Sequence, residues 1–151
     1  MSKVPANWDW IARAGEIVRA SGKPTKFIGN GDLQSVVQAK EYCRKYKTDG
    51  GMIARAIFGN PWLFDTQKTE VSVEEKLHVM IEHTEIFVRD LIDHKNFHVM
   101  KKHYKAYVAG FDGAKELRVQ LMESNSLDEI KNIVQQWLQD NPETAQVMIP
   151  C

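Results

Sequence analysis

The chain has 151 residues, 43% of them hydrophobic and 26% charged, with a formal net charge of zero at pH 7, which is typical of a folded globular protein and excludes an intrinsically disordered one. It has no run of about 20 apolar residues that would cross a membrane, and its first eight residues lack the apolar segment of a secretory signal. Its two cysteines, Cys43 and Cys151, are too few for a disulfide framework or a four-ligand zinc site, so we expect a reducing, cytoplasmic setting.

Charge is distributed unevenly along the chain. Residues 1–64 contain ten basic and five acidic side chains, whereas residues 65–151 contain ten basic and fifteen acidic ones. Such an asymmetry indicates that the chain consists of two parts with different functions.

In the first part, helical and extended patterns alternate. Apolar side chains recur at helical spacing over residues 8–20, and a second helix is predicted over 35–46. Extended runs at 25–28 and 50–53 follow these helices, and the first run ends in the turn Gly29-Asn30-Gly31-Asp32. The order helix, strand, turn, helix, strand predicts a βαβ unit with two parallel strands, preceded by a helix.

The second part has helical periodicity throughout. Four helices are predicted, over residues 71–92, 97–109, 114–122 and 127–138. Ser72 and Ser126 each precede a glutamate by three residues, which is the capping-box pattern of a helix start. Beyond residue 141 we expect the chain to fray, so the sequence predicts two strands in all.

The ends of the two predicted strands have the composition of a phosphate site. Parallel strands end at the same edge of a sheet, where backbone N–H groups point outward and attract phosphate. Gly29 and Gly31 let the backbone approach a ligand closely, and Arg55 follows the second strand about one strand spacing (~4.8 Å) away. This arrangement matches the phosphate site after the last two strands of a (β/α)8 barrel. A tight connection without a ligand is the alternative.

Several segments, taken in order, form the pattern of a known family. They are Pro5-Ala6-Asn7-Trp8, Phe27-Ile28-Gly29-Asn30-Gly31-Asp32, Asp49-Gly50-Gly51-Met52-Ile53-Ala54-Arg55-Ala56, Gly59-Asn60-Pro61-Trp62-Leu63-Phe64, Met100-Lys101-Lys102-His103, Tyr107, Gly110, Gly113-Ala114 and Leu117-Arg118. The pattern resembles the carboxy-terminal part of tRNA-dihydrouridine synthases, over residues 4–64 and 72–138.

This resemblance implies a fold and a function. The expected fold class is α/β plus all-α: residues 1–66 would be the carboxy-terminal fragment of a (β/α)8 TIM barrel, and residues 67–151 a small helical bundle that binds tRNA. Enzymes of this family are flavin-dependent oxidoreductases. They bind FMN, reduce it with NADPH and pass a hydride to a tRNA uridine, which gives 5,6-dihydrouridine.

The resemblance also implies which residues bind the cofactor. The segments that match Asn30, Gly31 and Asp32, and the pair that matches Ala54 and Arg55, hold the phosphate end of the flavin. Backbone amides and one guanidinium neutralise the phosphate and fix the ring in place. The sequence departs from the family at Ala54, where glycine is usual, and the extra methyl narrows the approach of the phosphate there.

The family's catalytic residues have no match in this chain. A loop cysteine that donates a proton to the uracil ring, together with a lysine and a histidine near the flavin, belongs to segments upstream of Met1. Cys43 falls in the middle of a predicted helix and is expected to be a buried or half-buried structural thiol. We therefore expect no catalytic residue here, a missing amino-terminal half of the barrel in a parent protein, and an isolated chain that is inactive.

A basic cluster in the second part suggests contact with RNA. Five basic side chains fall between positions 89 and 105 and alternate with aromatic ones, a combination suited to phosphate contacts and base stacking. The alternative is an ordinary helix with a solvated basic face. With the resemblance, Lys101, Lys102 and His103 become the expected contacts to the tRNA backbone, and Tyr107 is expected in the core.

The histidines do not predict a metal site. All five lie between positions 78 and 103, and His94 and His98 have the i, i+4 spacing of zinc ligands on a helix. The glutamate that accompanies such a pair in HExxH sites is absent. Solvated or RNA-facing histidines are the preferred interpretation.

Two further hypotheses stay open from the sequence. One is a stand-alone tRNA-binding helical module that carries a vestigial half-barrel, which would bind tRNA without a flavin. The other is a different phosphate-binding barrel, such as another FMN oxidoreductase, which would share the two turns but not the Lys101-Lys102-His103 segment.

Overall fold

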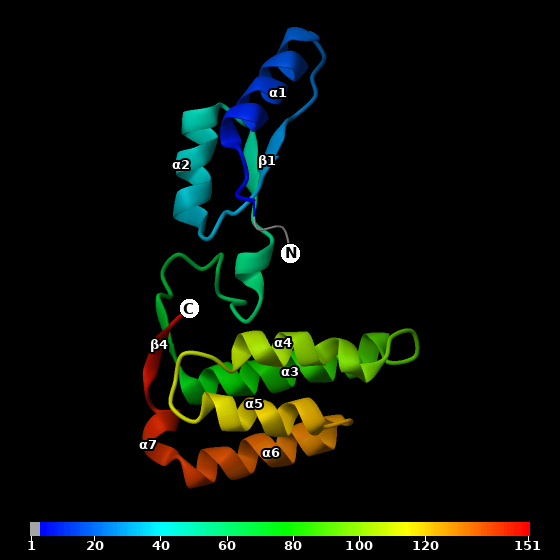
Figure 1. The fold of residues 1–151 in the computed structure, drawn as a ribbon, viewed down its shortest axis with the longest axis vertical. Coiled ribbons are helices and arrows are strands. Elements are labelled where there is room, and N and C mark those ends of the chain that lie inside the picture. Colours follow the sequence, from blue (N-terminus) through cyan, green and yellow to red (C-terminus); the bar gives the residue numbers. More distant parts are fainter. Residues whose placement is uncertain (1–3) are drawn as a thin grey trace. The chain divides into compact units, whose positions relative to one another are not determined.

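The computed structural model describes residues 4–151. Two compact units are distinguished (Figure 1): unit 1 contains the described residues up to Ile57 together with Leu63–Thr66, and unit 2 contains Phe58–Trp62 together with Gln67–Cys151. The domain boundaries 1–66 and 67–151 stay predictions, and their first three residues lie outside the described part of the chain. The short segment Phe58–Trp62 packs with the helical unit although it precedes the last residues of unit 1.

Unit 1 is a mixed α/β structure. Its elements are α1 (Trp8–Ala20), β1 (Ile28–Asn30), α2 (Val36–Tyr46), β2 (Gly50–Met52) and the 3-10 turn η1 (Arg55–Ile57). Strands β1 and β2 pair in parallel, with Ile28 opposite Gly50 and Asn30 opposite Met52. The prediction of two parallel strands joined through a helix is therefore confirmed.

Both helices of unit 1 begin at a side-chain cap. The side chain of Asn7 accepts hydrogen bonds from the N–H groups of Asp9 and Trp10, and that of Ser35 accepts one from Gln38. These bonds satisfy N–H groups that have no partner inside the helix. Local sequence thus fixes where the two helices start.

The helices cover one face of the small sheet closely. Trp8, Leu33 and Ala39 are the buried apolar residues of this unit. A Cβ atom at Gly29 would lie 2.5 Å from the Trp8 ring, and one at Gly51 would lie 3.1 Å from Leu33. Glycine at both positions therefore lets the strands approach the helices. On the strands, Ile28 and Met52 are instead about half exposed.

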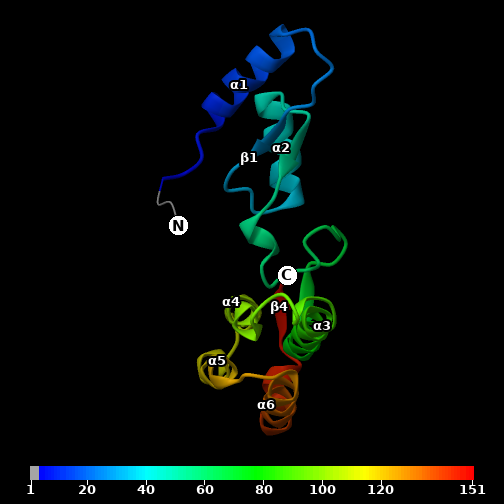
Figure 2. The ribbon, with the colours of Figure 1, turned by 90° about the vertical axis from the view of Figure 1, so that its right-hand side faces the viewer.

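Unit 2 is a helical bundle with a small antiparallel sheet. Its elements are β3 (Glu70–Ser72), α3 (Val73–Leu91), the 3-10 turn η2 (Phe97–Met100), α4 (Lys101–Tyr107), α5 (Ala114–Glu123), α6 (Leu127–Asp140), α7 (Pro142–Ala145) and β4 (Met148–Pro150). Figure 2 shows helices α3, α4, α5 and α6 nearly end-on, as the four rods of the bundle. Within residues 4–151, no helix is both long and apolar enough for a membrane span.

The core of unit 2 lies between these helices. Its fully buried side chains include Leu77, Met80, Met100, Tyr104, Leu117, Leu121, Ile130 and Val134. The hydroxyl of buried Thr84 donates to the carbonyl of Met80 and lies 3.3 Å from the Tyr104 hydroxyl. Burial raises the pKa of Tyr104 to about 12, so this side chain stays neutral. Tyr107 lies in the core, as predicted, and Trp137 lies there too.

The prediction of only two strands and a frayed carboxy terminus was wrong. Val71 pairs with Ile149 across the antiparallel strands β3 and β4, and both side chains are buried, with exposed fractions of 0% and 5%. Helix α3 consequently begins at Val73 rather than at Val71. A three-residue strand has too short a pattern to be detected without its partner, which lies 78 positions away.

Two other boundaries differ from the prediction. The first strand was predicted over 25–28 but covers Ile28–Asn30, because pairing with Gly50–Met52 extends through residues predicted to form the turn. The helix predicted over 97–109 is divided into η2 and α4, with Asn96 as the side-chain cap of η2.

We expect Ile149→Ala to destabilise the chain by about 2–5 kcal/mol, since it removes a buried branched side chain. Urea unfolding followed by circular dichroism measures this loss. The control is Met148→Ala on the adjacent residue, which is 54% exposed and should change the free energy of unfolding by less than about 0.5 kcal/mol. Equal effects of the two substitutions would contradict the packed strand β4.

Candidate functional site

The predicted phosphate turns lie at one edge of the sheet in unit 1. After β1 the chain passes through Gly31 and Asp32, which have positive φ angles of 145° and 54°. After β2 it passes through Ala54 into η1, which begins at Arg55. Because the strands are parallel, both turns leave from the same edge. The side-chain amide of Asn30 at the end of β1 lies 3.3 Å from the sulfur of Met52 at the end of β2.

An ion pair joins the two turns. Nη2 of Arg55 donates to Oδ1 of Asp32. The other carboxylate oxygen, Oδ2, accepts a hydrogen bond of 2.7 Å from the backbone N–H of Ala6. The two side chains are 53% and 38% exposed, so the pair faces solvent. Asp32 therefore holds the guanidinium at this edge of the sheet, and its own charge is balanced there.

Residues at the start of α1 contact the first turn. The indole Nε1–H of Trp8 donates to the carbonyl of Gly31 at 3.0 Å. A Cβ atom at Gly31 would lie 2.3 Å from that of Ala6, so both its backbone conformation and its surroundings require glycine. The sequence reasoning did not assign a role to Ala6 or Trp8. Their place in the motif Pro5-Ala6-Asn7-Trp8 was the available signal.

The chemistry of this edge suits a phosphate group. A guanidinium forms short, charge-assisted hydrogen bonds to phosphate oxygens, and successive backbone N–H groups in turns with left-handed residues form anion-binding concavities. Asp32 would repel a phosphate if its charge were unpaired, but Arg55 and the Ala6 amide balance it. Ala54, which follows β2, is exposed.

The two cysteines belong to different units. Cys43 is half-buried in α2, on the side of the sheet where its sulfur would be 3.5 Å from a Cβ atom at Gly51. Cys151 follows β4 in unit 2, and its thiol donates to the carbonyl of Lys68 at 3.2 Å. Cys43 therefore has the half-buried structural position that was expected.

The three residues proposed to contact RNA lie together on α4 but differ in environment. Nζ of Lys101 donates to the carbonyl of Met122, near the end of α5, at 2.6 Å. Lys102 is exposed, whereas His103 is half-buried. The ring centroid of His103 lies 5.3 Å from that of Phe58 and 4.9 Å from that of His83.

The two histidines form a largely desolvated pair. Burial, reinforced by the charges of His83 and Lys102, lowers the pKa of His103 to about 4. Burial also lowers the pKa of His83, whose Nδ1 lies 3.3 Å from the Tyr107 hydroxyl. His103 is consequently a neutral ring at pH 7, while Lys102 is an exposed cation beside it.

The other histidines show no metal-binding arrangement. Nε2 of His98 lies 3.1 Å from the side-chain oxygen of Asn125. His94 follows the end of α3 at Leu91, whereas His98 lies in η2, so the two histidines do not share a helix face. The part of the chain that the structure describes contains no cluster of three or more histidine, cysteine, aspartate or glutamate side chains that could hold a metal ion.

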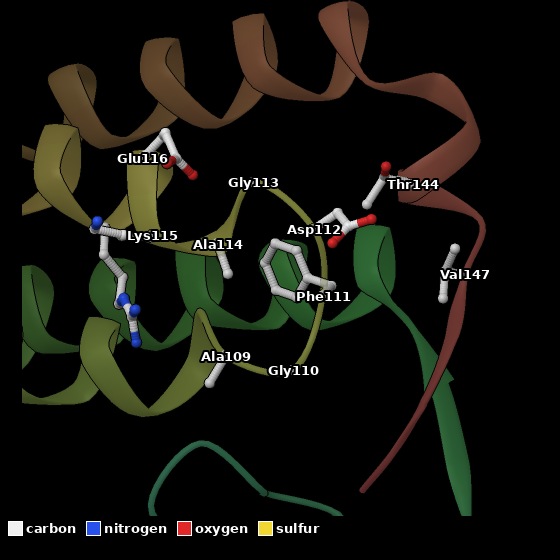
Figure 3. A pocket seen from close by; sticks show the side chains of 11 residues that line it. Ala109, Gly110, Phe111, Asp112, Gly113, Ala114, Lys115, Glu116, Thr144 and Val147 are labelled. Atoms are coloured by element: carbon white, nitrogen blue, oxygen red, sulfur yellow. The ribbon is translucent and has the colours of Figure 1, made fainter.

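A hollow of about 670 Å³ lies elsewhere in unit 2, at the loop between α4 and α5. Gly110 and Gly113 have φ angles of 89° and 76°, so the chain turns here between α4 and α5. Figure 3 shows Phe111 and Asp112 on this loop and Thr144 on the carboxy-terminal segment around the hollow. Acidic and basic side chains both line it, so its charge does not favour one class of ligand.

Known proteins match this chain over most of its length. The family model described as "Dihydrouridine synthase (Dus)" matches residues 1–143. A "Probable tRNA-dihydrouridine synthase" of Staphylococcus epidermidis is 34% identical over 135 residues, which cover 89% of this chain and 41% of that protein. One from Staphylococcus aureus is 33% identical over 138 residues, covering 91% and 42%. A "Probable tRNA-dihydrouridine synthase 2" of Bacillus subtilis is 30% identical over 135 residues, covering 89% and 42%.

The chain thus spans about two fifths of the length of the curated relatives it matches. The match includes both units, since it extends from the first turns of unit 1 into α7 of unit 2. A protein that shared only the phosphate turns would not produce this match across the helical unit.

The half-buried histidine pair predicts a pH dependence of stability. The pKa of His103 in the folded chain is about 4, below its ordinary value of 6.5, so the unfolded chain takes up the proton first as the pH falls. The free energy of unfolding should therefore decrease from about pH 6.5 down to about pH 4. Urea titrations at several pH values measure it.

The variant His103→Gln should lose less stability across this range than the parent chain. Exposed His94 provides the control, because His94→Gln should leave the pH profile unchanged. If the free energy of unfolding of His103→Gln falls with pH as steeply as that of the parent chain, His103 does not contribute to the pH dependence of stability.

Proposed function

The chain belongs to the dihydrouridine synthase family, and we propose that it supplies the cofactor-phosphate site and the tRNA-binding surface of a tRNA-dihydrouridine synthase. In this reaction NADPH reduces FMN, and a hydride passes from the flavin to a uridine of tRNA, giving 5,6-dihydrouridine. The relatives, which are named tRNA-dihydrouridine synthases, support tRNA as the substrate. Because the chain spans about two fifths of their length, the complete activity is proposed for a protein of the relatives' size.

Within this proposal, β1 and β2 are the last two strands of a (β/α)8 barrel. Their parallel pairing and the helix between them support this placement. The half-exposed apolar side chains Ile28 and Met52 support it further, because strand residues that face the inside of a barrel are normally covered. A two-stranded sheet is also marginal by itself.

The site for FMN comprises Asn30, Gly31 and Asp32 on the first turn and Ala54 and Arg55 on the second. The observation that carries the proposal is the ion pair of Arg55 with Asp32, which joins the two turns at the carboxyl edge of the parallel strands. FMN would supply the hydride chemistry. The residues of this chain would bind its phosphate, orient the cofactor and balance its charge.

The proton donor is proposed to lie outside these 151 residues. Cys43 is half-buried on α2 in unit 1, and the thiol of Cys151 in unit 2 donates a hydrogen bond to the Lys68 carbonyl, so both thiols have structural surroundings within their own units. We propose that the chain by itself is inactive and that the amino-terminal half of the barrel supplies the catalytic cysteine. Free thiols and a tRNA substrate support a cytoplasmic location.

The tRNA contact is proposed at Lys101, Lys102 and His103. Exposed Lys102 would bind a backbone phosphate directly. Nζ of Lys101 donates a hydrogen bond to a carbonyl near the end of α5, so this ammonium group would face an RNA phosphate while it is held at that helix end. His103, neutral at pH 7, would contribute a ring or a neutral hydrogen bond rather than a charge.

A stand-alone tRNA-binding helical module is the second candidate function. It is favoured by the core of unit 2, which is much larger than that of unit 1. This candidate predicts tRNA affinity without any affinity for the flavin.

We expect the purified chain to bind FMN more tightly than riboflavin, which lacks the phosphate. Arg55→Ala should weaken FMN binding roughly tenfold or more, because it removes a charge-assisted contact to the phosphate. Quenching of flavin fluorescence measures both affinities. Arg44→Ala, on the exposed face of α2, removes the same charge elsewhere in unit 1 and should leave the affinity unchanged. Equal binding of FMN and riboflavin would contradict the phosphate site.

We expect the chain to bind tRNA in a salt-sensitive manner through α4. Lys102→Ala should weaken binding and reduce the slope of log affinity against log salt concentration by about one. Gel-shift titrations at several ionic strengths measure both effects. Lys23→Ala, an exposed cation of unit 1, is the matched control. The assignment fails if tRNA does not shift at low ionic strength or if the two variants behave alike.

A further inference from the structure

Ala6 and Trp8, from the motif Pro5-Ala6-Asn7-Trp8 at the start of α1, contact the phosphate turn at three points. The N–H of Ala6 donates to Oδ2 of Asp32 at 2.7 Å. The indole N–H of Trp8 donates to the carbonyl of Gly31 at 3.0 Å. The Cβ atom of Ala6 lies where a side chain at Gly31 would begin. The partners are 23 and 26 positions apart in the chain, so these contacts are tertiary and not part of the turn's own geometry.

The Trp8 hydrogen bond determines which way one peptide group faces. In a trans peptide the carbonyl oxygen of one residue and the N–H of the next point in opposite directions, and no cis peptide occurs among the described residues. Trp8 is 6% exposed, and its ring lies against Gly29 on the helix-covered face of the sheet. With the Gly31 carbonyl directed to this indole, the N–H of Asp32 points away from it.

The turn is one that needs such support. Asp32 has a φ of 54° and Gly31 a φ of 145°, and a left-handed conformation costs a residue with a side chain free energy that contacts such as these offset. Rotation of the Gly31–Asp32 peptide would exchange the N–H for the carbonyl oxygen. A donor for an anion would then become a group that repels one.

We propose that Trp8 is a positioning residue for phosphate binding: its indole N–H fixes the Gly31–Asp32 peptide so that the Asp32 N–H faces the phosphate monoester of the cofactor. The inference rests on the proposed function, because it takes the phosphate edge as the binding site. Trp8 does not touch the ligand itself. It acts through the backbone of the turn.

A purely structural role for Trp8 makes a different prediction. Its ring packs edge-on against Tyr42, with centroids 4.9 Å apart, so loss of the ring would destabilise unit 1 without affecting phosphate recognition by the folded chain. Trp8→Phe keeps an aromatic ring in this place and removes the N–H. Trp8 replaced by β-(3-benzothienyl)alanine, which has sulfur in place of the N–H at nearly the same volume, makes the same test with less change in packing.

The experiment titrates the full chain and its variants with FMN and, separately, with riboflavin, and records thermal unfolding of each. Trp8→Phe should bind FMN about tenfold more weakly while its riboflavin affinity stays unchanged, so that the ratio of the two affinities falls. Trp10→Phe is the control, since Trp10 is on the same helix and 65% exposed. If Trp8→Phe does not fold, the benzothienyl variant decides in its place.

The outcomes separate the two proposals. An unchanged FMN-to-riboflavin ratio in a folded Trp8 variant would overturn the positioning role and leave the proposed function intact. A parent chain that binds neither flavin would overturn the proposed function and, with it, the role of Trp8. A parallel loss of affinity for both flavins would show that Trp8 only maintains the fold.

Discussion

The parallel pairing of β1 with β2 is the constraint on which the candidate site depends. It brings Asn30 opposite Met52, and the chain therefore leaves both strands at the same edge. Arg55 can reach Asp32 only because of this register. An antiparallel pairing would send the two turns to opposite ends of the sheet, and the same residues would have no common function.

Contacts from the helices of unit 1 restrict the backbone conformation of the two strands and of the first turn. Glycines at 29 and 51 let the strands lie against the helices, and the segment at the start of α1 holds the turn at Gly31. The result is a short backbone segment whose direction is set by contacts distant in sequence. Preorganised donors of this kind bind an anion at little cost in conformational entropy. In unit 2, by contrast, Lys101 and His103 are partly engaged within the bundle, and Lys102 is the exposed cation of the three.

Sequence reasoning predicted the features that local pattern determines. The helix starts at Ser72 and Ser126 follow from short-range rules, and the structure confirms both caps. Strands β3 and β4 were missed because neither is recognisable before Val71 meets Ile149. The hydrogen bond from Trp8 and the burial of His103 are also contacts between distant segments, which spacing along the chain does not encode. The family match extends over residues 1–143, whereas the cofactor and RNA contacts of individual residues stay predictions.

The most direct test of the central claim is to map the phosphate site by nuclear magnetic resonance on the ¹⁵N-labelled chain. On addition of FMN, the backbone amides of residues 30–32 and the Nε–H of Arg55 should shift together and saturate at one ligand concentration, while the amides of α4 and α5 stay unchanged. Shifts confined to unit 2, or shifts at residues 30–32 without Arg55, would contradict an anion site built by the two strand ends.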